Sequence, residues 1–381
     1  MELTGELRAL REAVRDLLRK HRPALDPAGP GCDPATTWRL LGEMGVAGLA
    51  VPERFGGAGA GPVEVSIVAE ELGRALAPVP LLGSAVLATQ AILAAGDQGA
   101  CERLLPPLAS GAATGALAWT DRDGRWDPAV AAFRAAARAG GGWTLSGTAH
   151  YVLDGDSAGI VIAAAALPDS DIGLFEVDPG QRGADRSLAP TMDQTRRLAV
   201  VGLDAAIGVP LSGAGADAAG HGAALAHARN LACVALAAEQ AGAAAEALEL
   251  TVGYSGQRVQ FGRSIASFQA IQHRLAELHV LVESARSLAY RAASVAAEQA
   301  GHGHDGDSDG TRLPLMAAAA KAYCSQALAA VAAEMIQLHG AIGATWEHDA
   351  HRFFKRAHGS AQLFGAPSTH LARIAAAVID D

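Results

Sequence analysis

The first third of the chain has a helical pattern of apolar positions. The apolar residues at its start recur every three or four positions, which places on one helix face Leu3, Leu7, Leu10, Val14, Leu17 and Leu18. Pro23, Pro27 and Pro30 are expected to end this helix. After a Gly-rich loop at 54–62, the helical pattern resumes at 63–76 and at 83–95. This region is therefore predicted to be helical, with short breaks.

The pattern changes between about residue 116 and residue 215. Short apolar runs there are separated by turn residues, as is typical of strands, and the four clearest runs span 142–147, 151–153, 159–163 and 173–177. From about residue 220 long helical patterns return, at 222–255, 265–300, 312–339 and 346–363, with a short one from 368. Helices, then strands, then helices predict three separate units, which we bound at 1–115, 116–216 and 217–381.

Composition narrows the function. The net charge of -10 argues against nucleic-acid binding, which needs a basic surface. The most apolar stretch, 223–250, contains Arg229, Glu239 and two further acids, so we expect a buried helix rather than a membrane span. Early charged residues interrupt any signal sequence, and the four cysteines are widely spaced, which favours a cytoplasmic protein.

One segment imitates a metal site. The stretch 301–310 is rich in His and Asp, but its spacing fits neither a zinc pattern nor a calcium loop. We predict a polar connector there and no metal site.

The segment from Arg258 to Gln272, RVQFGRSIASFQAIQ, is the most specific motif. An arginine between two long helices can make a two-pronged contact with a pyrophosphate. A second motif, QLHGAIG, begins at Gln337 and places glycines where backbone amides can approach a ligand. Together the two motifs resemble those of the acyl-CoA dehydrogenase family, and the resemblance extends over the whole chain.

The resemblance implies a fold, a cofactor and partners. The expected α+β fold has a helical N-terminal domain, a central β-barrel and a C-terminal four-helix bundle. The expected ligands are FAD and an acyl-CoA thioester, and an electron-transfer flavoprotein is the expected electron acceptor. The subunits would form a homotetramer or an α2β2 assembly with a homologue, because the pattern also resembles actinobacterial subunits of mixed acyl-CoA dehydrogenases.

The resemblance also assigns residues to the cofactor. Two family features are altered here: Leu153 stands where a hydroxyl residue is usual, and Ala341 replaces the second glycine of a pair. The residues expected to contact FAD are Thr120, Tyr151, Arg258, Phe261, Gln269, Gln337, His339, Gly340 and Ala341.

The catalytic base of the family is missing. Its usual position, after the last long helix, is occupied by Phe364, and the alternative position on the helix before Arg258 is occupied by Ala232. Neither side chain accepts a proton. Three explanations stay open: a subunit that works with or merely supports a homologous partner carrying the base, a substitute base for which Glu239 is the candidate, or a flavin-dependent oxidase or monooxygenase on the same scaffold.

Overall fold

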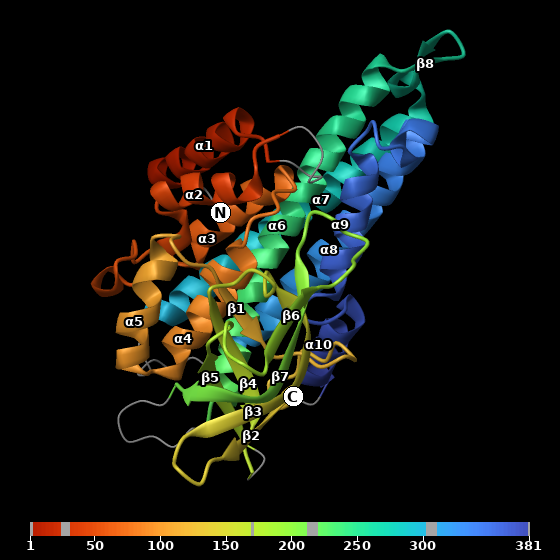
Figure 1. Ribbon diagram of the computed structural model, residues 1–381. Helices are drawn as coiled ribbons and strands as arrows, with labels where there is room; N and C mark the ends of the chain where they lie inside the picture. The colour runs from red at the N-terminus through yellow and green to blue at the C-terminus, as the bar shows by residue number, and fades with distance from the viewer. Residues whose placement is uncertain (1–2, 24–30, 169–170, 212–219, 302–310, 380–381) are drawn as a thin grey trace.

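The computed structural model describes residues 3–23, 31–168, 171–211, 220–301 and 311–379 (Figure 1). Pro27 and Pro30 and nearly all of the predicted polar connector, 302–310, lie outside the described residues.

The N-terminal part is helical, as predicted. The predicted helices at 63–76 and 83–95 correspond to α3 and to a π-helix, η3, that continues into α4. Side chains of Thr4, Asp33 and Asp97 accept hydrogen bonds from the first turns of three of the helices and fix where they begin. The elements are α1 (Gly5–Lys20), α2 (Pro34–Glu43), η1 (Val46–Gly48), η2 (Glu53–Phe55), α3 (Pro62–Arg74), η3 (Leu81–Ala88), α4 (Thr89–Ala95) and α5 (Gln98–Ala109).

The middle part is a closed barrel with its own apolar core. The ring closes because β4 pairs with β5, β5 with β7, β7 with β3, β3 with β2, and β2 with β4, while β1 adds to β4 and β6 to β7. The two predicted strands at 142–147 and 151–153 form one long strand, β3. The strands are β1 (Gly115–Ala118), β2 (Phe133–Ala137), β3 (Trp143–Leu153), β4 (Ile160–Ala166), β5 (Ile172–Val177), β6 (Ala184–Leu188) and β7 (Leu198–Pro210).

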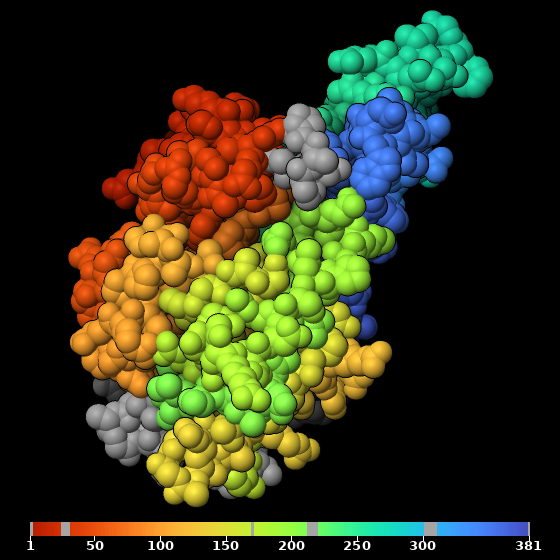
Figure 2. Space-filling model, in the orientation of Figure 1, coloured from red at the N-terminus to blue at the C-terminus, as the bar shows by residue number. Residues whose placement is uncertain are grey.

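The C-terminal part is a bundle of long helices that projects beyond the rest of the molecule (Figures 1 and 2). The predicted helix at 312–339 matches α8, whereas α9 begins later than predicted because residues 346–349 form a turn. The elements are α6 (Gly222–Gln257), β8 (Val259–Gln260), β9 (Arg263–Ser264), η4 (Ile265–Ser267), α7 (Gln269–Gly301), α8 (Arg312–His339), η5 (Gly340–Ala344), α9 (Ala350–Gln362) and α10 (Pro367–Ile379).

Within the described ranges, two helical segments are by length and composition alone apolar enough to cross a membrane, which is weak evidence for a span. In α6 the most apolar window is 89% buried within the chain, as expected for a core helix. In the segment 312–344 the corresponding window has a mean hydropathy of 1.4 but is only 39% buried. An apolar helix face that the chain itself does not cover needs another surface to pack against.

Two glycines bring α3 and α6 into close contact. A Cβ atom on Gly242 of α6 would lie 1.9 Å from the Glu70 carbonyl oxygen, and a Cβ on Gly73 of α3 would lie 2.0 Å from the Glu239 carbonyl oxygen. Each helix therefore meets the backbone of the other where it lacks a side chain, which joins the N-terminal part to the bundle.

We predict that Gly242→Ala lowers the free energy of unfolding by about 1–3 kcal/mol or more, because the added methyl must displace backbone rather than a flexible side chain. The matched control is Gly253→Ala on the same helix, where an added Cβ meets nothing within 4 Å. This control should be neutral, or more stable by up to about 1 kcal/mol, because alanine favours helix. Denaturant titration of both variants tests the contact, and equal effects would contradict it.

Candidate functional site

A cavity of about 1000 Å³ lies where the β-barrel meets the end of the bundle. Four segments far apart in sequence line it: the loop after β1, the barrel strands, the start of α6, and the turn between α9 and α10. The lining includes Asp123, Trp126 and Asp127 from the loop, Tyr151 and Leu198 from the barrel, Arg229 from α6, and Leu363, Phe364, His370 and Arg373 from the C-terminal segments.

Tyr151 faces this cavity from an irregular part of β3. The pairing of β3 with β7 shifts register between Ala149 and Val152, and Tyr151 has a φ of 56° within this bulge. A positive φ is costly for a bulky residue and is retained mostly where function requires it. The ring is 39% exposed, and its hydroxyl donates to the Arg122 carbonyl at 3.2 Å. The predicted flavin contact at Tyr151 is therefore available to a ligand.

Phe364 faces the same cavity from the turn between α9 and α10. It also has a positive φ, 60°, and its side chain is only 2% exposed. Its ring packs edge-on against Trp126, with ring centroids 5.1 Å apart, and Trp126 meets Trp119 in the same way. The residue that the sequence comparison predicts at the base position is thus part of an aromatic cluster.

A buried lysine fixes the backbone of this turn. The Lys321 ammonium donates to the carbonyls of Ala361 at 3.0 Å and Gly365 at 3.4 Å, and also to the Ser325 hydroxyl. Burial lowers the pKa of Lys321 to about 8. The carbonyls left free at the end of α9 are satisfied in this way, and Phe364 is held in place.

The surroundings of both base positions are apolar. Ala232 is fully buried and belongs to the same hydrophobic cluster as Phe364. Among the described residues lining the cavity, the carboxylates are Asp123 and Asp127, both on the exposed loop. Thr120 is 2% exposed and lies behind the cavity wall, where its carbonyl accepts from the His150 amide at 2.8 Å.

The other predicted flavin contacts lie at the far end of the bundle. Arg258 precedes the β8–β9 hairpin, whose turn residues Phe261 and Gly262 both have positive φ. The Phe261 side chain is 91% exposed. The remaining exposed contacts predicted at this end are Arg258, Gln269, Gln337, Gly340 and Ala341.

His339 differs from this group because its side chain is buried. Its ring stacks on Tyr254 at a centroid distance of 4.2 Å, and its Nδ1 lies 2.7 Å from the Met335 carbonyl oxygen. The Tyr254 hydroxyl also donates to the His339 carbonyl, which places the glycine turn beside the hairpin. The imidazole is therefore a packing element, and any ligand contact there would come from the turn that follows it.

The two groups of predicted flavin contacts are far apart on one chain. Arg229 at the cavity and Arg258 at the hairpin lie on the same helix, and their 29-residue separation corresponds to about 43 Å along its axis. In Figure 1 the hairpin and α10 lie at opposite ends of the bundle. One bound dinucleotide cannot contact both groups in a single subunit.

The substitute base proposed from sequence, Glu239, lies in a buried ion-pair network instead of lining this cavity. Its carboxylate is 2.5 Å from Nη1 of Arg356 and also accepts from Arg196. Arg356 is 2% exposed and donates further to the Thr195 hydroxyl and carbonyl. Two guanidiniums stabilise the ionised carboxylate, so the geometry favours a structural role for Glu239.

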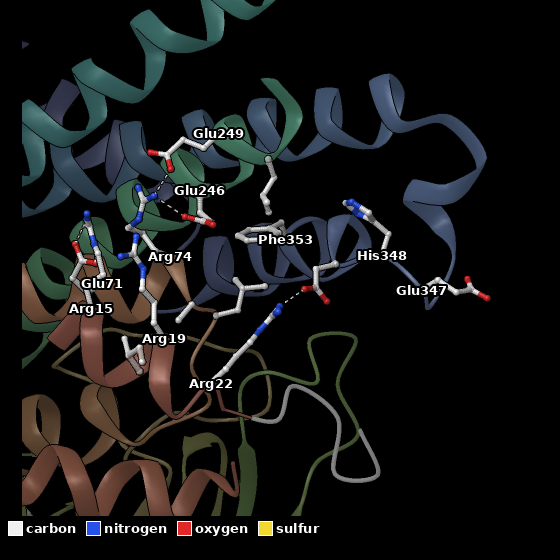
Figure 3. A pocket seen from close by; sticks show the side chains of 15 residues that line it. Arg15, Arg19, Arg22, Glu71, Arg74, Glu246, Glu249, Glu347, His348 and Phe353 are labelled. Carbon is white, nitrogen blue, oxygen red and sulfur yellow. Dashed lines mark hydrogen bonds and ion pairs between the residues drawn. The ribbon is translucent and has the colours of Figure 1, made fainter. Parts of the chain in front are cut away.

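A second pocket, of about 430 Å³, lies between α1, α3, α6 and the start of α9 (Figure 3). Most of its charged side chains form ion pairs, and Arg19 and Glu347 are the charged lining residues without one among the described residues. Arg15 pairs with Glu71 at 2.7 Å, Arg74 pairs with Glu246 and Glu249, and Arg22 pairs with Asp349. This pocket offers little unpaired charge to a ligand.

Some residues at the cavity were not predicted from sequence: Trp126, Arg229, His370 and Arg373. They belong to no common motif, and their sequence spacing gives no sign that they meet. The Trp in the turn-rich stretch DGRWDP was the one available signal, because an aromatic residue is unusual among turn residues.

The chain combines a helical part, a closed barrel and a helical bundle, with a cavity between barrel and bundle, which is the arrangement expected for the fold predicted from sequence. Residues 4–112 match the model of the acyl-CoA dehydrogenase N-terminal domain, and residues 220–379 match that of the C-terminal domain. The chain belongs to the acyl-CoA dehydrogenase family, which confirms the predicted fold, the flavin oxidoreductase class and FAD as cofactor.

The relatives include proteins named as pairs. Acyl-CoA dehydrogenase IpdE2 of Mycolicibacterium smegmatis is 38% identical over 99% of this chain and 100% of its own length. Among solved structures, a variant of the Tcur3481–Tcur3483 steroid ACAD is 31% identical, with a TM-score of 0.83 and 98% coverage of both chains. A chain of the ChsE4–ChsE5 complex from Mycobacterium tuberculosis is 26% identical, with a TM-score of 0.86. The match covers 100% of this chain and 99% of that chain.

We predict that Glu239→Gln lowers the free energy of unfolding by about 3 kcal/mol or more, because it removes the anion that Arg196 and Arg356 share and leaves Asp193 as the remaining partner of Arg356. Glu43→Gln is the matched control: its ion pair with Arg39 is exposed, and the change should cost less than about 1 kcal/mol. Chemical denaturation measures both. Unchanged stability together with lost substrate-dependent flavin reduction would instead identify Glu239 as the base.

Proposed function

We propose that this chain is the subunit of a mixed acyl-CoA dehydrogenase that lacks the catalytic base, and that it acts in α,β-dehydrogenation of an acyl-CoA thioester together with a homologous partner. The observation that carries this proposal is Phe364, which fills the base position with a buried ring packed on Trp126. Removal of the α-proton needs a group that can accept it, and neither Phe364 nor Ala232 can do so.

The residues present fit FAD if two subunits contribute. At the bundle tip, Arg258 is exposed and has no ion pair with any residue in the described ranges, so it can hold a phosphate in the two-pronged manner of guanidinium. Phe261 offers an exposed ring for packing, and Gln269 and Gln337 offer amides. At the cavity, Tyr151 offers a ring held in an unusual backbone conformation. When bound, FAD accepts the hydride that leaves the β-carbon of the substrate.

Two observations support a homologous partner. The tip and the cavity would each complete a site on another subunit, since about 43 Å separates them along α6. The most apolar 18-residue window of the segment 312–344, in which only 39% of the residues are buried within the chain, also supports a subunit interface. The related solved structures named above as pairs favour an α2β2 assembly over a homotetramer.

A second candidate function is that of a purely structural subunit, which completes the flavin site of its partner and binds no substrate. The aromatic packing of Phe364, Trp126 and Trp119 favours it, because these rings occupy part of the space beside the base position. An electron-transfer flavoprotein as acceptor and a cytoplasmic location complete the proposal; the first rests on the family and the second on the sequence.

We predict that the purified chain alone does not bleach its flavin when titrated anaerobically with a panel of acyl-CoA thioesters, and that the co-expressed pair does. The readout is flavin absorbance, and dithionite reduction of both samples controls for flavin content. Bleaching by the lone chain would refute the absence of a base. The pair could bleach its flavin to the same extent when substitutions block the cavity of this chain. That result would favour the structural role.

A further inference from the structure

The cavity beside Phe364 contains two arginines that lack a carboxylate partner. Neither Arg229 nor Arg373 forms an ion pair with any residue in the described part of the chain. Other arginines that the protein covers wholly or in part are paired: the buried Arg356 with Glu239, and the partly exposed Arg15 and Arg74 with the glutamates in Figure 3. Arg19 in the pocket of Figure 3 also lacks an ion pair with any described residue, but at the cavity beside Phe364 two such guanidiniums act on each other.

Arg229 is only partly satisfied by the protein. Its Nη1 donates to the Trp126 carbonyl at 3.1 Å, its Nη2 is 3.5 Å from the Asn230 side-chain oxygen, and its Nε is buried without a hydrogen-bond partner. Burial, and after it the charge of Arg373, lowers the pKa of Arg229. An arginine keeps its charge in proteins all the same. A buried charge that lacks its counter-ion is costly, so this guanidinium favours a bound anion.

Arg373 adds positive charge near Arg229, and a neutral histidine lies beside both arginines. His370, one turn before Arg373 on α10, is 1% exposed, and its ring nitrogens have no hydrogen-bond partner. Burial, followed by the charges of Lys321, Arg373 and Arg229, lowers the pKa of His370 to about 4. The histidine therefore stays neutral at pH 7 and offers one N–H donor. The acids lining the cavity, Asp123 and Asp127, lie on the exposed loop, and the charge of Asp127 acts on Arg229 more weakly than that of Arg373.

We propose that the Arg229–Arg373 end of the cavity binds an anionic group, a carboxylate or a phosphate, of the ligand that enters it. The walls between this end and Phe364 are apolar, formed by Trp126 and Leu363. Such walls suit an acyl chain that ends in a free carboxylate better than they suit a hydrated nucleotide. The inference rests on the proposed acyl-CoA substrate and narrows it to thioesters whose acyl part carries a negative charge.

The test compares two thioesters of equal chain length, adipoyl-CoA with a free carboxylate and hexanoyl-CoA without one. Calorimetric titration of the full chain should show tighter binding of adipoyl-CoA. Arg229→Gln should weaken adipoyl-CoA binding about 10- to 100-fold, as expected for a lost charge-assisted hydrogen bond, and leave hexanoyl-CoA unchanged. Arg229→Lys should retain part of the preference. Arg138→Gln, an exposed arginine on the barrel, is the matched control and should change neither.

Further arms identify the source of the anion. Equal losses for adipoyl-CoA, hexanoyl-CoA and free CoA in Arg229→Gln would support the anion site and assign it to the CoA phosphates. A loss of affinity confined to FAD would support the anion site and assign it to the phosphates of FAD. Arg373→Gln is measured in the same way, so that the conclusion does not depend on one variant that could have a local folding defect at Arg229. Thermal melting checks that both variants are folded.

Unchanged affinities in both variants, or no binding of adipoyl-CoA, CoA, FAD or inorganic phosphate to the wild-type chain, would overturn the proposal. These outcomes are separate from failure of the proposed function, which appears as absence of flavin bleaching in the co-expressed pair whatever the chain binds.

Discussion

The guanidinium of Arg356 joins all three parts of the chain. From α9 it donates to Glu239 of α6 at 2.5 Å and to the Thr195 carbonyl in the loop before β7 at 2.8 Å, and it reaches the Leu76 carbonyl after α3 at 3.5 Å. Asp193 of the same loop lies 3.1 Å from its Nε. Because these charges are buried, each is tolerated only while the others are in place. The barrel is therefore held at one position on the bundle.

This fixed position creates the cavity and limits what one subunit can do. Tyr151 from the barrel and Phe364 from the bundle face one space because the two domains cannot slide apart without exposing unpaired charge. From there α6 runs to the opposite tip, where Arg258 and Phe261 emerge. This helix holds the cavity and the tip of one subunit far apart. A single ligand molecule therefore cannot contact both of them within one subunit. The proposed assembly rests on helix geometry combined with the placement of the motifs.

The sequence predicted the structure well where interactions between neighbouring residues determine it or where a motif is contiguous. The predicted helix at 312–339 matches α8 because its apolar pattern and flanks agree, and the break between two long helices at Arg258 came from one unbroken motif, although the hairpin within it was not predicted. Strands β2, β6 and β7 were not predicted, because β6 is polar and the Ala- and Gly-rich segments of β2 and β7 hide the alternation.

The site was harder to predict because tertiary contacts build it. Arg229 and Arg373 are more than a hundred residues apart, and nothing in their spacing shows that they meet. Glu239 was an attractive base from helix periodicity alone, but its two arginine partners become visible only in three dimensions. His339 matched a family motif, whereas its imidazole is covered by Tyr254.

The central claim is that no single copy of this chain contains a whole flavin site. Native mass spectrometry of the purified protein, alone and with its co-expressed homologue, tests this claim most directly by counting FAD per assembly. We predict that FAD is found only on dimers or larger assemblies and that it dissociates when they do. A monomer that retains a full equivalent of FAD would contradict the account.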